Sequence, residues 1–220
     1  MKPNSIYLIR HGESEGNIDS SIYQNVPDWK VPLTTKGIEQ AKKAGQHLYK
    51  NLKLSNYQSD RKPVQFYCSP WYRARETIKT IREQMGLSDE LIKEDPRIRE
   101  QDWGNYQEEI PIRKVKIERH IYGSFFYRMP NGESGADVYD RVTTFIDTLY
   151  RDFDDPNFPE NVIIGTHGIT LKVILMRWLH WTVETFDSYK TPENCCIIKM
   201  SLQDNQRYKL ITSLKLYSKS

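Results

Sequence analysis

The sequence predicts an α/β fold in which a mostly parallel central sheet lies between two layers of helices. Three short apolar runs typical of buried strands lie at 6–9, 64–68 and 162–165, and each precedes a stretch whose apolar residues have helical spacing. Strands that alternate with helices favour a parallel sheet covered on both faces, a three-layer sandwich. No repeat, low-complexity tract or linker interrupts the chain, so we expect 1–220 to form a single domain.

The first half of the chain carries two strand and helix pairs. The strand at 6–9 ends at Arg10, and the second strand at 64–68 precedes a helix over 71–85 that Gly86 would end. Between them, Thr35 is the candidate cap of a helix. The apolar residues of that helix are spaced three or four apart: Ile38, Ala41, Ala44, Leu48 and Leu52.

The second half repeats the alternation and then closes the sheet. Ser134 and Asp137 have the spacing of a capping box. They open a helix with one apolar face: Val138, Val142, Phe145, Ile146 and Leu149. The strand at 162–165 precedes a helix through Val173, Leu175 and Leu179. The segments 195–200 and 208–214 are typical of a hairpin that turns at 204–205.

Composition excludes several classes of protein. With 38% hydrophobic and 28% charged residues in 220, the chain is globular rather than disordered. A net charge of +3 is too small to indicate nucleic-acid binding. The chain has no apolar run of 18 residues, so we expect no membrane span. Residues 1–9 lack the features of a signal peptide, and Cys195 and Cys196 are adjacent among only three cysteines, so we expect a reduced, cytoplasmic protein.

Reactive side chains follow each of the three predicted strands. Arg10 and His11 follow the first, Ser69 and then Arg73 the second, and His167 the third. Ligands of open α/β sheets bind beyond the carboxyl ends of the strands. We therefore expect these side chains to meet in one site.

The residue types at this edge point to phosphoryl transfer. A neutral imidazole can attack phosphorus, and the guanidinium groups of Arg10 and Arg73 would disfavour its protonation, since the ordinary pKa of histidine is about 6.5. Guanidinium groups also match phosphate oxygens with planar paired donors and stabilise the transferring group. A carboxyl group such as that of Glu100 can supply the proton of the leaving group.

Five segments in order carry a family resemblance. Residues 8–17, Leu-Ile-Arg-His-Gly-Glu-Ser-Glu-Gly-Asn, closely resemble the opening motif of the histidine phosphatase superfamily, the phosphoglycerate-mutase-like proteins. The later motifs of this family are similar to 69–77, to 97–104 with its acid, to Gly-Glu-Ser at 132–134 and to Gly-Thr-His-Gly at 165–168. Segments 100–106, 125–128 and 132–134 most resemble the plant and fungal mutase-like phosphatases. The resemblance runs from about residue 5 to 200 and implies the phosphoglycerate-mutase-like α/β fold.

The resemblance also implies a role for each site residue. His11 would be the nucleophile that becomes phosphohistidine, and Glu100 would first protonate the leaving group and then activate water. The phosphate pocket would be formed by the remaining members of the motifs: Arg10, Asn17, Arg73, His167 and Gly168. The expected partner is a small anionic phosphorylated substrate, and the sequence carries no signal for an oligomeric state.

Structural roles remain open for several of these residues. A histidine at a strand end can serve as a cap or a packing residue, and Glu100 lies in a charge-rich segment where a surface carboxylate is common. Asn17 can cap a turn. A basic helical face, which can be solvated or can attract anions, is formed by Arg113, Lys114, Lys116 and Arg119.

Three functions compete at this stage. The sequence has no phosphate-binding glycine loop, His-Glu-x-x-His or Cys-x-x-Cys motif, so we expect no metal or other cofactor. Hydrolysis of small phosphomonoesters is the leading hypothesis. A phosphoglycerate mutase is the alternative, although segment 107–129 lacks the paired arginines expected of one. An inactive phosphate-binding or scaffolding protein is the third, and it would not need an acid beside the nucleophile.

Overall fold

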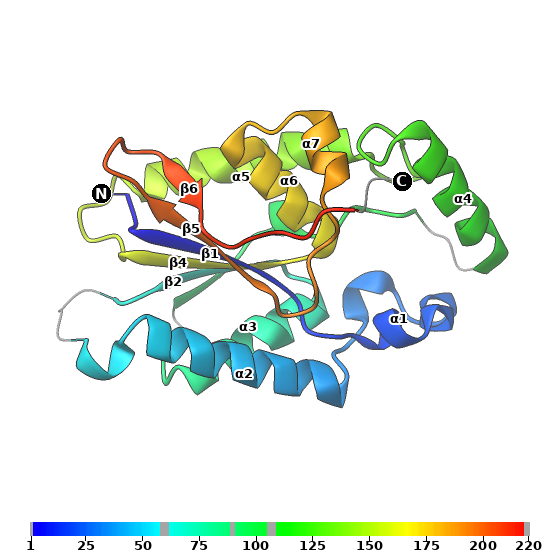
Figure 1. Cartoon of the computed structure of the whole chain (residues 1–220). Helices are drawn as coiled ribbons and strands as arrows, with labels where there is room; N and C mark the ends of the chain where they lie inside the picture. The colour runs from blue at the N-terminus through cyan, green and yellow to red at the C-terminus, as the bar shows by residue number, and fades with distance from the viewer. Residues whose placement is uncertain (1, 58–61, 89–90, 105–108, 218–220) are drawn as a thin grey trace.

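A six-stranded sheet lies between two layers of helices in the computed structural model, which describes residues 2–57, 62–88, 91–104 and 109–217 (Figure 1). The strands lie in the order β3-β2-β4-β1-β5-β6. Their bounds are Ser5–Arg10 for β1, Gln65–Cys68 for β2, Ile92–Glu94 for β3, Asn161–Thr166 for β4, Ile197–Leu202 for β5 and Tyr208–Leu210 for β6. The predicted α/β sandwich is confirmed.

The sheet is parallel in its first four strands and antiparallel at one edge. β3 pairs with β2, β2 with β4 and β4 with β1, all in parallel register. β5 and β6 form the predicted hairpin, and β5 pairs antiparallel with β1. Sequence analysis missed β3, because it is only three residues long and its one apolar residue, Ile92, is half-buried.

Strand β1 contributes side chains to the hydrophobic cores on both faces of the sheet, because successive side chains point to opposite faces. Ile6 and Leu8 belong to the hydrophobic cluster beneath α5 and α6, whereas Tyr7 and Ile9 belong to the cluster beneath α2 and α3. Successive side chains of a strand point to opposite faces, so a strand covered on both sides reads as a continuous apolar run. The run at 6–9 is therefore the signature of a central strand.

Helices α2 (Thr35–Asn51) and α3 (Tyr72–Gln84) cover one face of the sheet (Figure 1). Thr34, not Thr35, caps α2: its Oγ1 accepts a hydrogen bond of 3.0 Å from the amide of Gly37. The prediction was wrong by one residue because two adjacent threonines satisfy the same sequence rule. After α3, Gly86 adopts a φ of 67°, as expected of a glycine that ends a helix.

Helices α5 (Gly135–Asp152) and α6 (Gly168–Leu179) cover the opposite face, followed by the short α7 (Val183–Ser188) (Figure 1). The predicted capping box of α5 is confirmed: Oγ of Ser134 accepts from the amide of Asp137, whose carboxylate accepts from the amide of Ser134. Helix α6 begins directly after His167, at the end of β4.

Two further helices lie beyond the end of the sheet at which β1 ends, α1 (Glu15–Ile18) and α4 (Glu109–Tyr122) (Figure 1). Short 3-10 helices complete the described chain: η1 (Ser20–Gln24), η2 (Asp28–Lys30), η3 (Leu54–Asn56) and η5 (Pro96–Ile98). Residues 105–108, part of the segment that follows Glu100, lie outside the described residues. The space above the carboxyl ends of the strands is thus bordered by α1 and α4.

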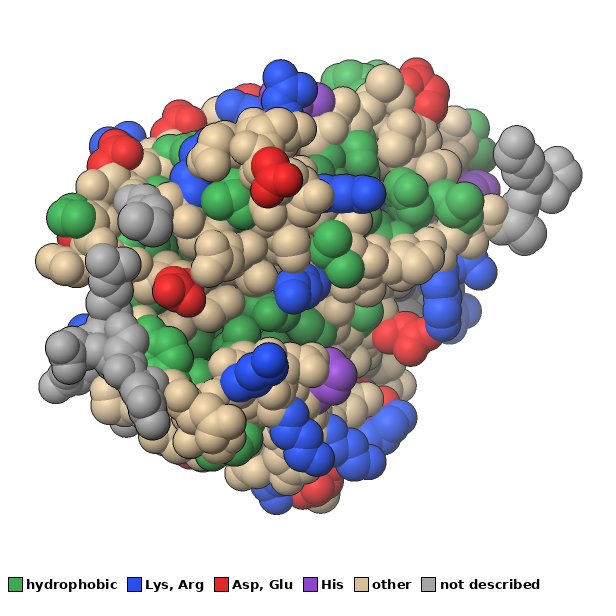
Figure 2. Space-filling model, turned by 60° about the vertical axis from the view of Figure 1, so that its left-hand side comes forward, with side chains coloured by type: hydrophobic (Ala, Val, Ile, Leu, Met, Phe, Trp, Pro, Cys, Tyr) green, Lys and Arg blue, Asp and Glu red, His purple; other side chains and the backbone are tan. Residues whose placement is uncertain are grey.

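The surface carries charges of both signs. On the face drawn in Figure 2, Lys and Arg side chains lie in separate places among acidic and hydrophobic ones. The three cysteines are free, and Cys68 is buried in the core strand β2, as predicted. Within the described parts of the chain, no helix is both long and apolar enough to cross a bilayer.

Candidate active site

His11 lies at the carboxyl end of β1, where the backbone holds its ring in a defined state. Its amide donates to the carbonyl of Thr166 at 2.9 Å, and its Nδ1 lies 2.7 Å from the carbonyl oxygen of Gly12. A carbonyl can only accept, so Nδ1 carries the proton. The lone pair of the neutral ring is therefore on Nε2.

Gly12 is required by a close approach of backbones. A Cβ at this position would lie 2.6 Å from the carbonyl oxygen of Gly37 in α2, and a Cβ on Gly37 would lie 2.1 Å from the carbonyl oxygen of Glu13. The amide of Gly12 also donates to Oγ1 of Thr77 at 2.9 Å. These contacts fix the loop that follows β1 and with it the position of His11.

Arg73, in the first turn of α3, spans the site from His11 to η2. Its Nε donates to Nε2 of His11 at 3.3 Å, and its Nη1 donates to both Oδ1 and the carbonyl oxygen of Asp28 at 2.8 Å. The side chain is 5% exposed. Arg73 is therefore buried between His11 and Asp28.

The environment keeps His11 neutral. Burial has the largest effect on His11 and lowers its pKa, and the positive charges of Arg73 and Arg10 lower it further, so that it lies well below the usual value. The hydrogen bond to Gly12 opposes this shift but does not reverse it. A neutral imidazole with Nε2 facing an arginine has the state that attack on phosphorus requires.

His167 follows β4 and is completely buried beside His11. The two ring centroids are 5.2 Å apart, and Nε2 of His167 lies 2.8 Å from Oγ of Ser69. Burial, then the charge of Arg73, lowers the pKa of His167 well below its usual value. Its Nδ1 is buried without a hydrogen-bond partner. When the hydroxyl of Ser69 donates to Nε2, Nδ1 carries the proton and can donate to a phosphate oxygen.

Arg10 and Gly168 meet above the two histidines. Arg10 donates from Nη1 to the carbonyl oxygen of Pro192 at 2.7 Å, while its buried Nε has no partner. A Cβ on Gly168 would lie 3.6 Å from this Nε and 3.7 Å from Oε2 of Glu100. The side chains of Arg10 and Glu100 are thus close to one another, and among the described residues two buried donors, Nε of Arg10 and Nδ1 of His167, have no hydrogen-bond partner.

Glu100 is attached to the first turn of α6. Its carboxylate accepts from the amides of Ile169 at 3.2 Å and Thr170 at 3.1 Å, and from the hydroxyl of Thr170 at 3.2 Å. These bonds hold the carboxyl group beside Arg10, within the same site as the two histidines. Glu100 is therefore not a free surface carboxylate, which was the alternative that sequence analysis left open.

Asn17 has a local structural role that sequence analysis left open. Its Oδ1 accepts from the amide of Ser14 at 3.1 Å and from Nδ2 of Asn194 at 3.1 Å. Asn194 also donates from Nδ2 to the carbonyl of His11 at 3.0 Å. Asn17 therefore caps α1 close to His11, and its contact with phosphate stays a prediction.

Sequence analysis did not assign a site role to Asp28 or Asn194. Asp28 lies in a polar stretch without periodicity, and Asn194 is 183 residues from the carbonyl that it binds. No local pattern marks either residue. Ser69 was expected among the side chains at the strand ends without a defined role, and its contact with His167 gives it a specific one.

The predicted basic face of α4 divides in the structure. Lys114 and Lys116 are exposed, whereas Arg119 is half-buried with its guanidinium 5.4 Å from the centre of the Trp103 ring. Its Nε and Nη2 are buried and have no hydrogen-bond partner within the described part of the chain. Burial lowers the pKa of Arg119, and the negative charge of Glu100 opposes this effect, so the two side chains are close enough to interact electrostatically.

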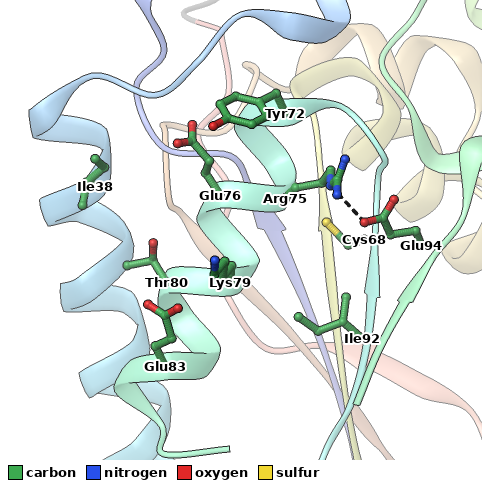
Figure 3. A pocket seen from close by; sticks show the side chains of 10 residues that line it. All are labelled: Ile38, Cys68, Tyr72, Arg75, Glu76, Lys79, Thr80, Glu83, Ile92 and Glu94. Atoms are coloured by element: carbon green, nitrogen blue, oxygen red, sulfur yellow. Dashed lines mark ion pairs between the residues drawn. The ribbon is translucent and has the colours of Figure 1, made fainter. Parts of the chain in front are cut away.

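A separate hollow lies on the outer side of α3, away from the histidines (Figure 3). It is lined by side chains of α3 together with Ile38 of α2 and the edge strand β3, and Arg75 pairs there with Glu94 at 2.9 Å. Its lining shares no residue with the cluster around His11. Among the residues that the structure describes, no three His, Cys, Asp or Glu side chains form a group that could hold a metal ion.

The fold and the ordered motifs agree with a known family. The family model described as the Histidine phosphatase superfamily (branch 1) matches residues 6–212, so the chain belongs to this superfamily. A solved structure of a mycobacterial glucosyl-3-phosphoglycerate phosphatase has the same fold, with a TM-score of 0.72 and 22% identity over 96% of this chain and 98% of that one.

Two curated relatives match almost the whole chain. The phosphoglycerate mutase-like protein AT74 of Arabidopsis thaliana is 42% identical over 217 residues, which cover 96% of this chain and 68% of the relative. The broad-range acid phosphatase DET1 of Saccharomyces cerevisiae is 31% identical over 300 aligned positions, which cover 97% of this chain and 90% of the relative. The resemblance to plant and fungal mutase-like phosphatases is confirmed.

Proposed function

We propose that this protein hydrolyses phosphomonoesters of small molecules through a phosphohistidine formed on His11. One observation carries the proposal: Nδ1 of His11 is anchored on Gly12, and its unprotonated Nε2 accepts a hydrogen bond of 3.3 Å from Nε of Arg73. The phosphatase name of the yeast relative supports an enzyme of this class.

The proposed reaction has two steps, formation of the phosphohistidine and its hydrolysis. In the first, Nε2 of His11 forms a bond to phosphorus while the bond to the leaving oxygen breaks, and Glu100 gives that oxygen a proton. In the second, water attacks phosphorus, Glu100 takes the proton of the water, and the N–P bond breaks to release phosphate. Arg10, Arg73 and His167 hold the phosphoryl oxygens throughout, with the unpartnered Nε of Arg10 and Nδ1 of His167 as two of the donors.

The covalent intermediate is the decisive test. The protein is mixed with a phosphate-labelled monoester in EDTA, quenched at alkaline pH, where phosphohistidine survives, and digested to map the label. We expect label on the peptide that contains His11, no label on His11→Ala, and wild-type labelling of His120→Ala, whose histidine is exposed on α4. Wild-type turnover by His11→Ala would contradict the proposal.

A phosphoglycerate mutase is the second candidate, and Arg119 is the observation that favours it. A buried guanidinium with unused donors near Glu100 would suit a leaving group that carries a second anionic group, such as the carboxylate of glycerate. The test measures inorganic phosphate and 2-phosphoglycerate in parallel from 3-phosphoglycerate, with and without 2,3-bisphosphoglycerate. We expect phosphate release to be the faster reaction. Isomerisation many times faster than hydrolysis would identify a mutase.

A further inference from the structure

We propose that Asp28 is a positioning residue of the phosphate pocket. Its carboxylate holds the guanidinium of Arg73 against His11. Its negative charge weakens the binding of phosphate at neutral pH. The inference rests on the proposed function, because it assumes that the phosphoryl group binds between His11 and Arg73. It assigns a role to a residue outside the motifs that carry the family resemblance.

The contact between Asp28 and Arg73 determines how the guanidinium is turned. Nη1 of Arg73 donates to Oδ1 and to the carbonyl oxygen of Asp28, both at 2.8 Å, while Nε donates to His11. Two anchors on one nitrogen and a third on Nε fix the plane of the group. The contact with Asp28 therefore fixes which edge of the Arg73 guanidinium faces His11.

The segment that carries Asp28 is itself tied to α3. Asp28 begins the 3-10 helix η2, which leads to the fully buried Val31. Two residues later, the amide of Leu33 donates to Oε2 of Glu76 at 2.9 Å. Glu76 lies one helical turn after Arg73 in α3, so the carboxylate and the guanidinium are held on one rigid frame.

Charges from three other elements act on Asp28. Burial raises the pKa of Asp28, Arg73 of α3 lowers it, and the carboxylates of Glu100 and Asp102 raise it again. Burial raises the pKa of Tyr23 in η1, and the negative charge of Asp28 raises it further. The net direction for Asp28 is upward, towards the protonated form.

A bound phosphate adds a further negative charge beside this carboxylate. Like charges in close contact disfavour joint ionisation, so phosphate binding favours the neutral form of Asp28. Affinity for phosphate should therefore rise as the pH falls through the pKa of Asp28. Asn in place of Asp keeps an oxygen acceptor for Arg73 and removes the charge, which separates the two effects of this residue.

The binding test uses inorganic phosphate as the probe and requires no turnover. Phosphate is titrated calorimetrically into wild type, Asp28→Asn and Glu94→Gln at several values between pH 5 and pH 8, and variants are compared at the same pH so that the titration of phosphate cancels. Glu94→Gln is the matched control, since it removes the carboxylate of another arginine pair on α3 (Figure 3).

We expect Asp28→Asn to bind phosphate at least about threefold more tightly than wild type at pH 8, as a like charge a few ångströms away implies. The ratio should decrease as the pH falls, and Glu94→Gln should match wild type throughout. Equal affinities of wild type and Asp28→Asn at every pH would overturn this inference alone. Failure of both proteins to bind phosphate would overturn the proposed function as well.

The positioning effect has its own readout in kcat. Asp28→Ala removes the side-chain acceptor as well as the charge, so Arg73 loses one of its anchors. We expect kcat on an aryl phosphate to fall about tenfold below that of Asp28→Asn, because small misplacements of a catalytic group are costly. Equal kcat values for the two variants would show that the side chain does not position Arg73.

Discussion

Nε of Arg73, in the first turn of α3, donates a hydrogen bond of 3.3 Å to Nε2 of His11, which directly follows β1. The bond has two consequences. It requires His11 to be unprotonated at Nε2, and it places a guanidinium where the phosphoryl group would arrive in the proposed reaction. Four predictions follow from this arrangement and from the elements that support it.

Replacement of Arg73 by Lys should lower kcat by about 10³-fold on any phosphomonoester. Lys keeps the positive charge but lacks the planar set of donors that binds His11, Asp28 and phosphate together. Steady-state kinetics measure the effect. Arg75→Lys, two residues further along on the exposed side of α3, is the control and should keep wild-type kcat. Normal kcat in Arg73→Lys would refute the role of the guanidinium.

Glu100→Gln should lose more rate on an alkyl phosphate than on p-nitrophenyl phosphate. A poor leaving group needs the proton of a general acid, whereas an activated aryl group departs without it. Gln has the same size and retains one acceptor oxygen, which can keep one of the two amide bonds from the first turn of α6, so the fold should be preserved. The ratio of kcat values for the two substrates is the measurement.

Asp102→Asn is the control for this experiment, because Asp102 is an exposed carboxylate two residues from Glu100. Glu133 is a poor competitor for the acid role, since its carboxylate accepts from Arg99 at 2.5 Å and from Arg141 at 2.9 and 3.0 Å. Equal losses on both substrates in Glu100→Gln would assign the proton to another group.

The folded protein should lose stability as the pH falls below about 6.5, the ordinary pKa of histidine. The pKa values of His11 and His167 are both lowered in the folded state, so below this pH the unfolded chain binds more protons than the native one. Each histidine contributes a slope of up to about 1.4 kcal/mol per pH unit. Their contribution to the slope vanishes above the unfolded pKa.

Urea unfolding at pH 5.0 to 7.5 measures this slope. His11→Asn removes one of the two buried imidazoles and should reduce the dependence of the unfolding free energy on pH. His120→Asn changes an exposed histidine and should leave the dependence as it is in wild type. An unchanged slope in His11→Asn would show that His11 is protonated in the folded protein.

Ser134→Ala should lower the free energy of unfolding by about 1 kcal/mol, the usual cost of removing a helix cap. The variant loses the Oγ that accepts from the amide of Asp137 at 3.2 Å. Since Ser134 does not contact His11 or Arg73, kcat should stay near wild type. Denaturant melts test the first expectation, with the exposed Ser55→Ala as control. A loss of activity without a loss of stability would place Ser134 in the site instead.

The sequence was informative wherever a local pattern has a direct structural cause. His11, Ser69 and His167 follow apolar runs, and a parallel sheet brings the carboxyl ends of its strands to one edge, so their meeting was predictable. The capping box at Ser134 was predictable because it involves residues only three apart. The edge strand β3 was not, since three residues with one apolar side chain carry no periodicity.

By itself, the sequence determined the class of fold, the order of the central strands and the long helices that cover them, and the reactive residues at the strand ends. Only the tertiary structure decided which groups surround them: that Arg73 is buried and held by Asp28, and that Asn194 supports the carbonyl of His11. Local patterns reflect interactions within one turn or one strand. The partners of Arg73 and His11 are 45 and 183 residues away, so their contacts exist only after the chain has folded.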